Sequence, residues 1–146
     1  MEIKKYQELS VDELYDILSL RNEVFIVEQN CVYQDIDYID QSSYHVYIKE
    51  NNKIIAYARL IEPGITYKDS LSIGRVLVKK DNRKQGLAND LLLFVIEQAS
   101  LLYPSLDIAI SAQSYLLNFY STLGFKQVSE EYLEDGIPHI KMILTN

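Results

Sequence analysis

Hydrophobic residues recur along most of the chain with one of two spacings, and each spacing predicts a different element. Apolar and polar residues alternate across residues 44–50 and 53–61, which predicts two strands joined by a turn at 50–52. Residues 70–80 are apolar on both faces, so we expect a strand inside a sheet. A looser alternation over residues 2–9 predicts a first strand.

A helical spacing begins soon after that first strand. Apolar residues recur every three or four positions across residues 11–29, which predicts one long helix or two short ones. Ser10 and Glu13 form a capping-box pattern at its start. The polar stretch that follows is expected to be a loop.

Two later helices are predicted in the second half of the chain. The longer one has Asp81 or Asn82 as its expected cap and ends near Pro104. The shorter one covers residues 113–123 and is expected to stop at Gly124.

Three strands complete the predicted order. Residues 105–111 alternate, and residues 125–132 and 137–144 read as hairpin arms around the Asp-Gly turn at 135–136. Strand–helix–strand units mixed with consecutive strands predict a single α/β domain, with a mixed sheet and helices on its faces.

Composition narrows the class of protein. The 146 residues suit one domain, and 48% of them are hydrophobic, which is enough for a packed core. A net charge of −7 and a pI near 4.8 argue against nucleic-acid binding, and a local acidic face would favour a cationic substrate. Without a signal peptide, a membrane-spanning run or a cysteine pair, we expect a cytoplasmic protein with no membrane partner.

One glycine stands where the longest helix is expected to begin. Gly86 costs about 1 kcal/mol there relative to alanine, and four cations lie close by: Lys79, Lys80, Arg83 and Lys84. Free amides at a helix start bind anions, so this stretch could hold a pyrophosphate. An ordinary solvated helix start with a tolerated glycine is the alternative. The motifs of P-loop and dinucleotide-binding proteins are absent.

Four segments, in order, resemble the GNAT N-acetyltransferases. "VLVKKDNRKQGLANDLL" resembles their acetyl-CoA-binding motif through Arg83, Gly86 and Ala88, and "SAQSYLLNFYSTLGF" resembles their second motif. "LRNEVFIVEQNCVYQDID" and "EEYLEDGIPHIKM" resemble the ElaA-like subgroup. The resemblance covers nearly the whole chain.

The resemblance implies a fold and a cofactor. It implies the GNAT fold, a mixed sheet of about seven strands with helices on both faces, in which the strands splay apart after the fourth. It also implies acetyl-CoA as co-substrate, with the pantetheine arm of the cofactor in the gap between the splayed strands. The implied cofactor contacts are Val76, Leu77, Val78, Arg83, Lys84, Gln85, Gly86, Leu87, Ala88 and Asn118. Asn118 could instead be a surface amide.

The resemblance also implies catalytic residues. Tyr120 stands where many GNAT proteins carry a general acid, and a phenol roughly matches a thiol leaving group; it could instead be a core tyrosine. The candidate bases are Glu28 and His139, and His45 is a further histidine with the same alternative; each could instead be structural. Bulk water could also take the proton.

Charged residues in two segments could surround an acceptor pocket. Asp35, Asp37 and Asp40 form one group, and the second is Glu130, Glu131, Glu134 and Asp135. Together they could attract a cationic amine, or they could be solvated. Arg21 and Arg75 lie in apolar contexts, so we expect each to pair with one of these carboxylates inside the fold. Cys31 is expected to be a small buried residue rather than a reactive thiol.

These observations predict an N-acetyltransferase that moves acetyl from acetyl-CoA to a primary amine in a ternary complex. The acceptor would be a small molecule or a peptide. The alternative is a non-catalytic acyl-CoA-binding sensor or scaffold. Two histidines and one cysteine at wide spacing make no metal-ligand set, so no metal is expected. Twelve tyrosines could supply the interface of a homodimer.

Overall fold

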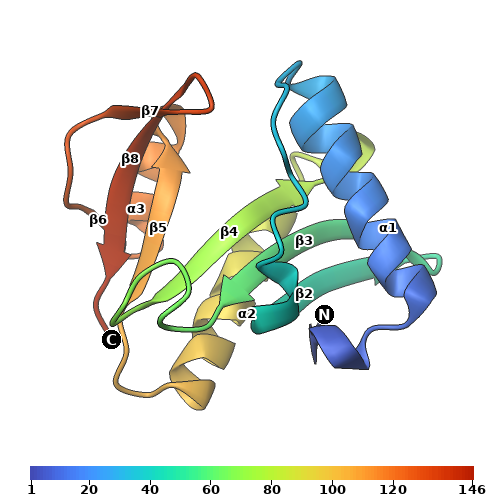
Figure 1. The fold of residues 1–146 in the computed structure, drawn as a ribbon, viewed down its shortest axis with the longest axis horizontal. Coiled ribbons are helices and arrows are strands. Elements are labelled where there is room, and N and C mark those ends of the chain that lie inside the picture. The colour runs from blue at the N-terminus through green and yellow to red at the C-terminus, as the bar shows by residue number, and fades with distance from the viewer.

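The computed structural model describes residues 1–146 and contains one eight-stranded sheet (Figure 1). The strands follow the order β1-β2-β3-β4-β5-β8-β6, and β7 pairs with β8. Their bounds are β1 Glu2–Lys5, β2 Ser43–Glu50, β3 Lys53–Ile61, β4 Leu71–Val78, β5 Ile108–Gln113, β6 Lys126–Gln127, β7 Tyr132–Glu134 and β8 Ile137–Leu144.

The sheet opens between its fourth and fifth strands. Only β4 and β5 run parallel, and their register covers just Leu71 with Ile108 and Ser72 with Ala109. Beyond Ser72 the two strands diverge, as Figure 1 shows. The mixed α/β fold with a splayed sheet is therefore confirmed, and β4 is left with an unpaired edge from Ile73 onward.

Helices cover both faces of the sheet. The α1 helix, Val11–Arg21, lies in front of it in Figure 1, and α2, Leu87–Leu102, lies behind it with α3, Leu117–Thr122. Each face has its own core, because alternate strand residues point to opposite sides. The larger core is on the α2 side, and a smaller one on the α1 side includes Ile17 and Tyr57.

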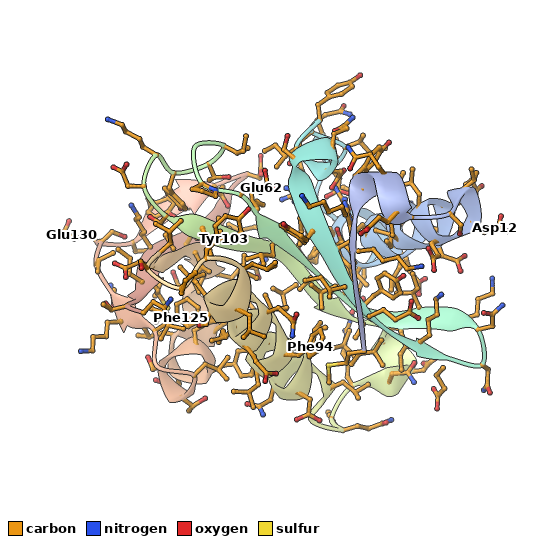
Figure 2. The ribbon with its side chains drawn as sticks, turned by 90° about the horizontal axis from the view of Figure 1, so that it is seen from below. Asp12, Glu62, Phe94, Tyr103, Phe125 and Glu130 are labelled. Carbon is orange, nitrogen blue, oxygen red and sulfur yellow. The ribbon has the colours of Figure 1, made fainter.

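A tyrosine at the C-terminal end of α2 links the helix to the residue that follows β3. The Tyr103 hydroxyl donates a hydrogen bond to the Glu62 carboxylate at 3.3 Å, and Figure 2 shows these two residues near each other. No helix in the structure combines the length and apolarity needed to cross a bilayer.

The N-terminal elements are shorter than predicted. β1 ends at Lys5, and Tyr6–Glu8 form a 3-10 turn instead of continuing the strand. Ser10 caps α1 by accepting from the Glu13 amide at 3.1 Å, so the capping box is confirmed. The rest of the predicted helix is a π-helical stretch, Asn22–Glu28, which we call the π segment.

The predicted cap of the long helix is wrong. Asp81 and Asn82 lie in a 3-10 turn with Lys80, and α2 begins at Leu87 after Gly86. Gly86 is itself the N-terminal cap residue, with φ +79°, a backbone conformation that glycine adopts without steric cost. The glycine thus turns the chain into the helix.

The last predicted strand before the hairpin is broken in two. Residues 125–132 contain β6 and the beginning of β7, and a loop separates them. Both pieces pair with β8. The hairpin turn is confirmed, since Asp135 and Gly136 have φ values of +50° and +76°.

A bulge distorts β4 beside the opening. Tyr57 pairs with Leu77 and Arg59 pairs with Gly74, so one residue of β3 stands opposite two residues of β4. The two residues that stand opposite Ala58 are Arg75 and Val76, and Arg75 has φ +54°. Positive φ is strained for a residue other than glycine, and bulges often re-aim side chains next to active sites.

A buried ionic network anchors the long loop between the π segment and β2. Asp35 and Asp40 accept hydrogen bonds from Arg21, whose side chain is fully buried, at 2.9 and 2.7 Å. Arg59 binds Asp37 and Asp40, and Arg75 binds Asp35 and Asp37. The expected pairing of Arg21 and Arg75 inside the fold is therefore confirmed.

Replacing Arg21 with leucine is expected to destabilise the protein strongly. Removing one partner of a buried ion pair leaves unpaired charge and costs about 3–5 kcal/mol. The matched control is Lys53→Leu, because Lys53 is largely exposed and lies 3.5 Å from Asp16; its cost should stay below about 1 kcal/mol. Urea unfolding measures both, and equal costs would contradict the structural role of the network.

Acid should weaken the same network. Burial alone would raise the pKa of Asp37, but the hydrogen bonds and charge of Arg59 outweigh this effect and lower the pKa to about 2. Arg21 and Arg59 lower the pKa of Asp40 in the same way. A carboxylate with a depressed pKa contributes stability above its unfolded value near 3.8, and the contribution is lost as pH falls toward 2. In Asp37→Asn, the free energy of unfolding should therefore fall less steeply between about pH 4 and pH 2 than in the wild-type protein. An unchanged pH profile would contradict this role of Asp37.

Candidate active site

Two cavities lie on either side of the bulged part of β4. One, of about 550 Å³, extends along β4 to the start of α2, and the other, of about 430 Å³, lies between β4 and the β7–β8 hairpin. Six residues line both: Phe25, Gln29, Val76, Tyr115, Leu116 and Tyr120. We call the first the helix-start cavity and the second the hairpin cavity.

The helix-start cavity ends at a run of free backbone donors. The amides from Lys84 to Ala88 form no hydrogen bond within the protein. Lys84 and Gly86 both have positive φ, which curves this stretch around the end of α2. Consecutive free N–H groups at the positive end of a helix form an anion site, and Gly86 leaves its face open because it has no side chain.

Arg83 holds a fixed position beside these amides. Its Nε donates to the Val78 carbonyl oxygen at 2.9 Å, and its two terminal nitrogens form a bidentate pair with the Glu28 carboxylate. The hydrogen bonds from Arg83 lower the pKa of Glu28. Glu28 therefore stays charged near neutral pH, lines the helix-start cavity and does not line the hairpin cavity.

The open edge of β4 runs from the hairpin cavity into the helix-start cavity and lines both. Val76, Leu77 and Val78 line the helix-start cavity, and β5 has already diverged from them. Val76 also lines the hairpin cavity and has no register partner on β3. This stretch of backbone can pair with an extended ligand in the way that a neighbouring strand would.

Tyr120 lies where the cavities join. Its ring is 7% exposed and packs edge-on against Phe119 and Phe125, with ring centroids 5.2 and 5.8 Å away. Burial raises the pKa of Tyr120 to about 12. The hydroxyl is therefore protonated throughout the neutral range and can donate a proton.

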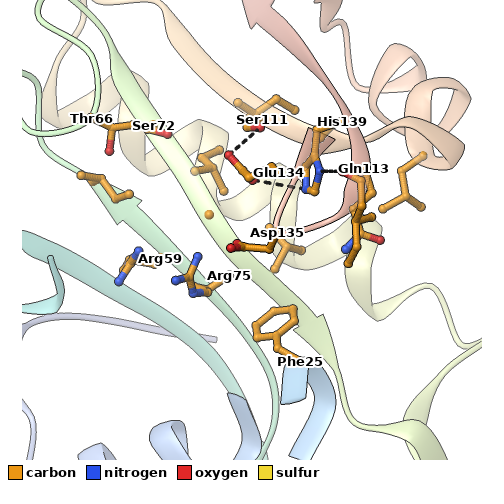
Figure 3. A pocket seen from close by; sticks show the side chains of 18 of the residues that line it. Phe25, Arg59, Thr66, Ser72, Arg75, Ser111, Gln113, Glu134, Asp135 and His139 are labelled. Atoms are coloured by element: carbon orange, nitrogen blue, oxygen red, sulfur yellow. Dashed lines mark hydrogen bonds and ion pairs between the residues drawn. The ribbon is translucent and has the colours of Figure 1, made fainter. Parts of the chain in front are cut away.

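A short polar chain crosses the wall of the hairpin cavity (Figure 3). Glu134 accepts a hydrogen bond from Ser111 at 3.3 Å, and its other oxygen lies 3.3 Å from Nε2 of His139. Nδ1 of His139 donates to the Ile137 carbonyl oxygen at 2.7 Å. The carboxylate of Glu134 and the ring of His139 are thus held against each other inside the cavity.

A family model described as an acetyltransferase (GNAT) domain matches residues 4–146. The chain belongs to the GNAT acetyltransferase family. Protein ElaA of Escherichia coli strain K12 is 40% identical over 139 residues, which are 94% of this chain and 90% of ElaA. A UPF0039 protein of Schizosaccharomyces pombe is 42% identical over 143 residues, 97% of this chain and 93% of that protein.

Solved structures agree with the sequence relatives. The crystal structure of Escherichia coli ElaA superposes with a TM-score of 0.92 at 38% identity, covering 98% of this chain and 97% of that one. An acyl-CoA N-acyltransferase from Pseudomonas aeruginosa gives 0.93 at 36% identity, covering 99% and 98%. The ElaA-like subgroup is therefore confirmed, and the fold is that of an acyl-CoA N-acyltransferase.

Most of the predicted cofactor contacts of this GNAT protein lie together in the helix-start cavity. Gln85 and Asn118 differ from the rest, because both side chains are exposed and line neither cavity. Within the described chain, no group of three His, Cys, Asp or Glu residues could hold a metal ion.

The predicted acidic rim is only partly present. Asp35, Asp37 and Asp40 are paired with arginines, and of these Asp37 lines the hairpin cavity together with Glu134 and Asp135. The remaining two glutamates, Glu130 and Glu131, do not line it.

Cys31 is less buried than predicted and lines the hairpin cavity, whereas His45 lies away from both cavities. Cys31 is half-buried on the wall of the hairpin cavity, and its thiol donates to the Asp135 carbonyl oxygen at 3.7 Å. His45 is fully buried between the Tyr57 hydroxyl and the Asp40 carbonyl oxygen, and burial lowers its pKa. His45 lines neither cavity.

Sequence reasoning missed the contribution of the π segment. Phe25 lies in it and Gln29 follows it directly, and both line the two cavities. The apolar spacing predicted a helix there but gave no sign of π geometry, which widens the turn and changes which side chains share a face. Arg59 and Ser111 were also missed, since each reads from sequence as an ordinary strand residue.

Charge changes at the Glu28–Arg83 pair should move acetyl-CoA affinity in opposite directions. Arg83→Gln should weaken binding roughly tenfold to a hundredfold, because hydrogen bonds to charged groups contribute about 1.5–3 kcal/mol. Glu28→Gln should tighten binding a few-fold, because it releases Arg83 and removes a nearby negative charge. Calorimetry measures both, with Lys126→Gln as a control on β6; weaker binding in both variants would contradict the anion site.

Proposed function

We propose that this protein transfers the acetyl group of acetyl-CoA to a primary amine by direct attack in a ternary complex. The observation that carries the proposal is the junction of the two cavities. Tyr120 and Val76 line both, so a thioester that enters along the helix-start cavity reaches an acceptor in the hairpin cavity there. The whole chain would act as one acetyltransferase domain.

Coenzyme A fits the helix-start cavity by its chemistry. Its diphosphate would sit on the free amides of residues 84–88, with Arg83 and Lys84 as nearby cations. Its pantetheine amides would pair with the open edge of β4 at Val76 and Val78. The family match supports this placement, because GNAT proteins are acyl-CoA-dependent.

The acyl transfer needs a neutral amine and a stabilised oxyanion. The amine nitrogen attacks the thioester carbonyl carbon, a C–N bond forms, and the carbonyl oxygen becomes an oxyanion. Backbone N–H groups stabilise such a charge. The Val76 amide is our candidate donor, because the bulge leaves this residue without a register partner and it lines both cavities.

The leaving thiolate then needs a proton. Collapse of the tetrahedral intermediate breaks the C–S bond and returns the electron pair of the oxyanion to the carbonyl. Tyr120 would donate its phenolic proton to the sulfur, because it lies at the junction of the cavities and is protonated at neutral pH. Burial raises its pKa to about 12, which makes it a weaker acid than a free phenol. The tyrosinate that forms recovers a proton from solvent or from the acceptor nitrogen.

The ammonium form of the acceptor must lose a proton before attack, because a lysine-like amine has a pKa near 10.4. The hairpin cavity contains one suitable arrangement, the Glu134 carboxylate paired with His139. Glu28 is bound to Arg83 in the other cavity, which does not support it as the base.

The proposed function is tested by thiol release from acetyl-CoA with a panel of amines, amino acids and peptides. The proposal predicts amine-dependent release and an acetylated product by mass spectrometry. Tight acetyl-CoA binding without thiol release for any amine would contradict the proposed acetyltransferase activity. It would favour a non-catalytic acyl-CoA-binding module.

Tyr120→Phe should separate chemistry from binding. Loss of a general acid should lower kcat by roughly a hundredfold or more, whereas acetyl-CoA binding should be preserved because the ring remains. Tyr15→Phe is the control, since Tyr15 is an exposed residue of α1. An unchanged kcat in Tyr120→Phe would remove this residue from the mechanism.

A further inference from the structure

The two walls of the hairpin cavity carry different ionic groups. Arg59 and Arg75 lie on β3 and β4, and Glu134 and Asp135 lie on the hairpin (Figure 3). The arginines of the first wall are paired with the three loop aspartates, so the charges on this side balance and only unpaired N–H groups remain for a ligand, whereas the hairpin wall is negative. This polarity therefore distinguishes between classes of amine.

The arginine wall has more donors than the aspartates use. Arg75 donates from Nε to Asp35 at 2.7 Å and from Nη2 to Asp37 at 3.3 Å, but its Nη1 makes no hydrogen bond and is not buried. Nε of Arg59 is buried without an acceptor. Only the Arg75 nitrogen is therefore accessible to a ligand in the cavity, because the Arg59 nitrogen is buried.

The backbone places Arg75 at this wall. It is one of the two residues of the β4 bulge, has φ +54°, and is followed directly by Val76 at the junction of the cavities. Its guanidinium is held by Asp35 and lies over the Tyr33 ring, 5.5 Å from the centroid. A strained but firmly anchored cation next to the acetyl-transfer position is suited to orienting a substrate.

The hairpin wall is anchored as well. Glu134 is held by Ser111 and His139, and Asp135 is joined through its carbonyl oxygen to Cys31. Neither carboxylate is paired with an arginine or a lysine. Asp135 makes no ion pair and is available to an ammonium group, whereas Glu134 already lies 3.3 Å from Nε2 of His139. The cavity volume of about 430 Å³ is within the range of small-ligand sites.

We propose that the acceptor is an amine that also carries a carboxylate, an amino acid, with Nη1 of Arg75 binding the carboxylate and the Glu134 and Asp135 side chains attracting the ammonium group. Arg75 then determines specificity, because a charge-assisted hydrogen bond rewards acceptors that bear the carboxylate. This inference rests on the acetyltransferase function proposed above and specifies its substrate class.

The test uses matched pairs of acceptors with the wild-type protein and acetyl-CoA. Each amino acid is compared with its carboxamide and with its decarboxylated amine, for example lysine with lysinamide and cadaverine. We expect kcat/KM to favour the best amino acid over its two analogues by roughly tenfold or more. Equal or better use of the analogues would overturn the inference while leaving the acetyltransferase function intact.

Arg75→Lys and Arg75→Gln examine the residue itself. The ratio of kcat/KM between the amino acid and its carboxamide should fall toward one in both variants, because neither substituted side chain provides the guanidinium donor. Lys126→Gln, on exposed β6, should keep the wild-type ratio. If the Arg75 variants keep the wild-type ratio of kcat/KM, the assignment of Arg75 is wrong. If the variants do not fold, the comparison of acceptor pairs with the wild-type protein decides the question.

The two proposals fail in distinguishable ways. Release of thiol with amines regardless of their carboxylate contradicts only the substrate class. Absence of release with every acceptor, while acetyl-CoA still binds, contradicts both the acetyltransferase function and the substrate class that rests on it.

Discussion

The loss of pairing between β4 and β5 is the constraint on which the rest of the site depends. The strands share only two register pairs, so β4 continues with one edge free of backbone partners. Backbone polar groups need hydrogen-bond partners, and a strand edge left free inside the fold is a place where an extended ligand can bind. The bulge at Arg75 and Val76 lies on this same stretch. It re-aims the Arg75 side chain and leaves Val76, at the junction of the two cavities, without a register partner on β3.

A second constraint holds the opposite side of the site in position. The loop after the π segment has little regular structure, and its three aspartates are bound by arginines from α1, β3 and β4. Buried ion pairs contribute less to net stability than to fixing one arrangement, because desolvation offsets much of their attraction. The network therefore positions this loop against β4, and it leaves Nη1 of Arg75 without a partner and not buried.

Much of this could be predicted from sequence, for identifiable reasons. Alternation located β2, β3 and β8, and the apolar stripe located α2, because burial of one face imposes these periods. The start of α2 could not be placed correctly, since Asp81 and Asn82 look like good caps and only the three-dimensional path shows that Gly86 takes that role. Pairing of Arg21 and Arg75 with the loop aspartates was predicted, but the part of Arg59 was not, because it lies 19 and 22 residues from its partners and reads as an ordinary strand residue.

The central claim is that free amides at the start of α2 and the open edge of β4 bind acetyl-CoA. The most direct measurement is a titration of the ¹⁵N-labelled protein with acetyl-CoA, followed by amide chemical shifts. The account predicts that residues 76–78 and 84–88 shift most, whereas residues on the exposed face of α1, such as Tyr15, hardly move. Unchanged shifts at residues 84–88 with millimolar acetyl-CoA would contradict it.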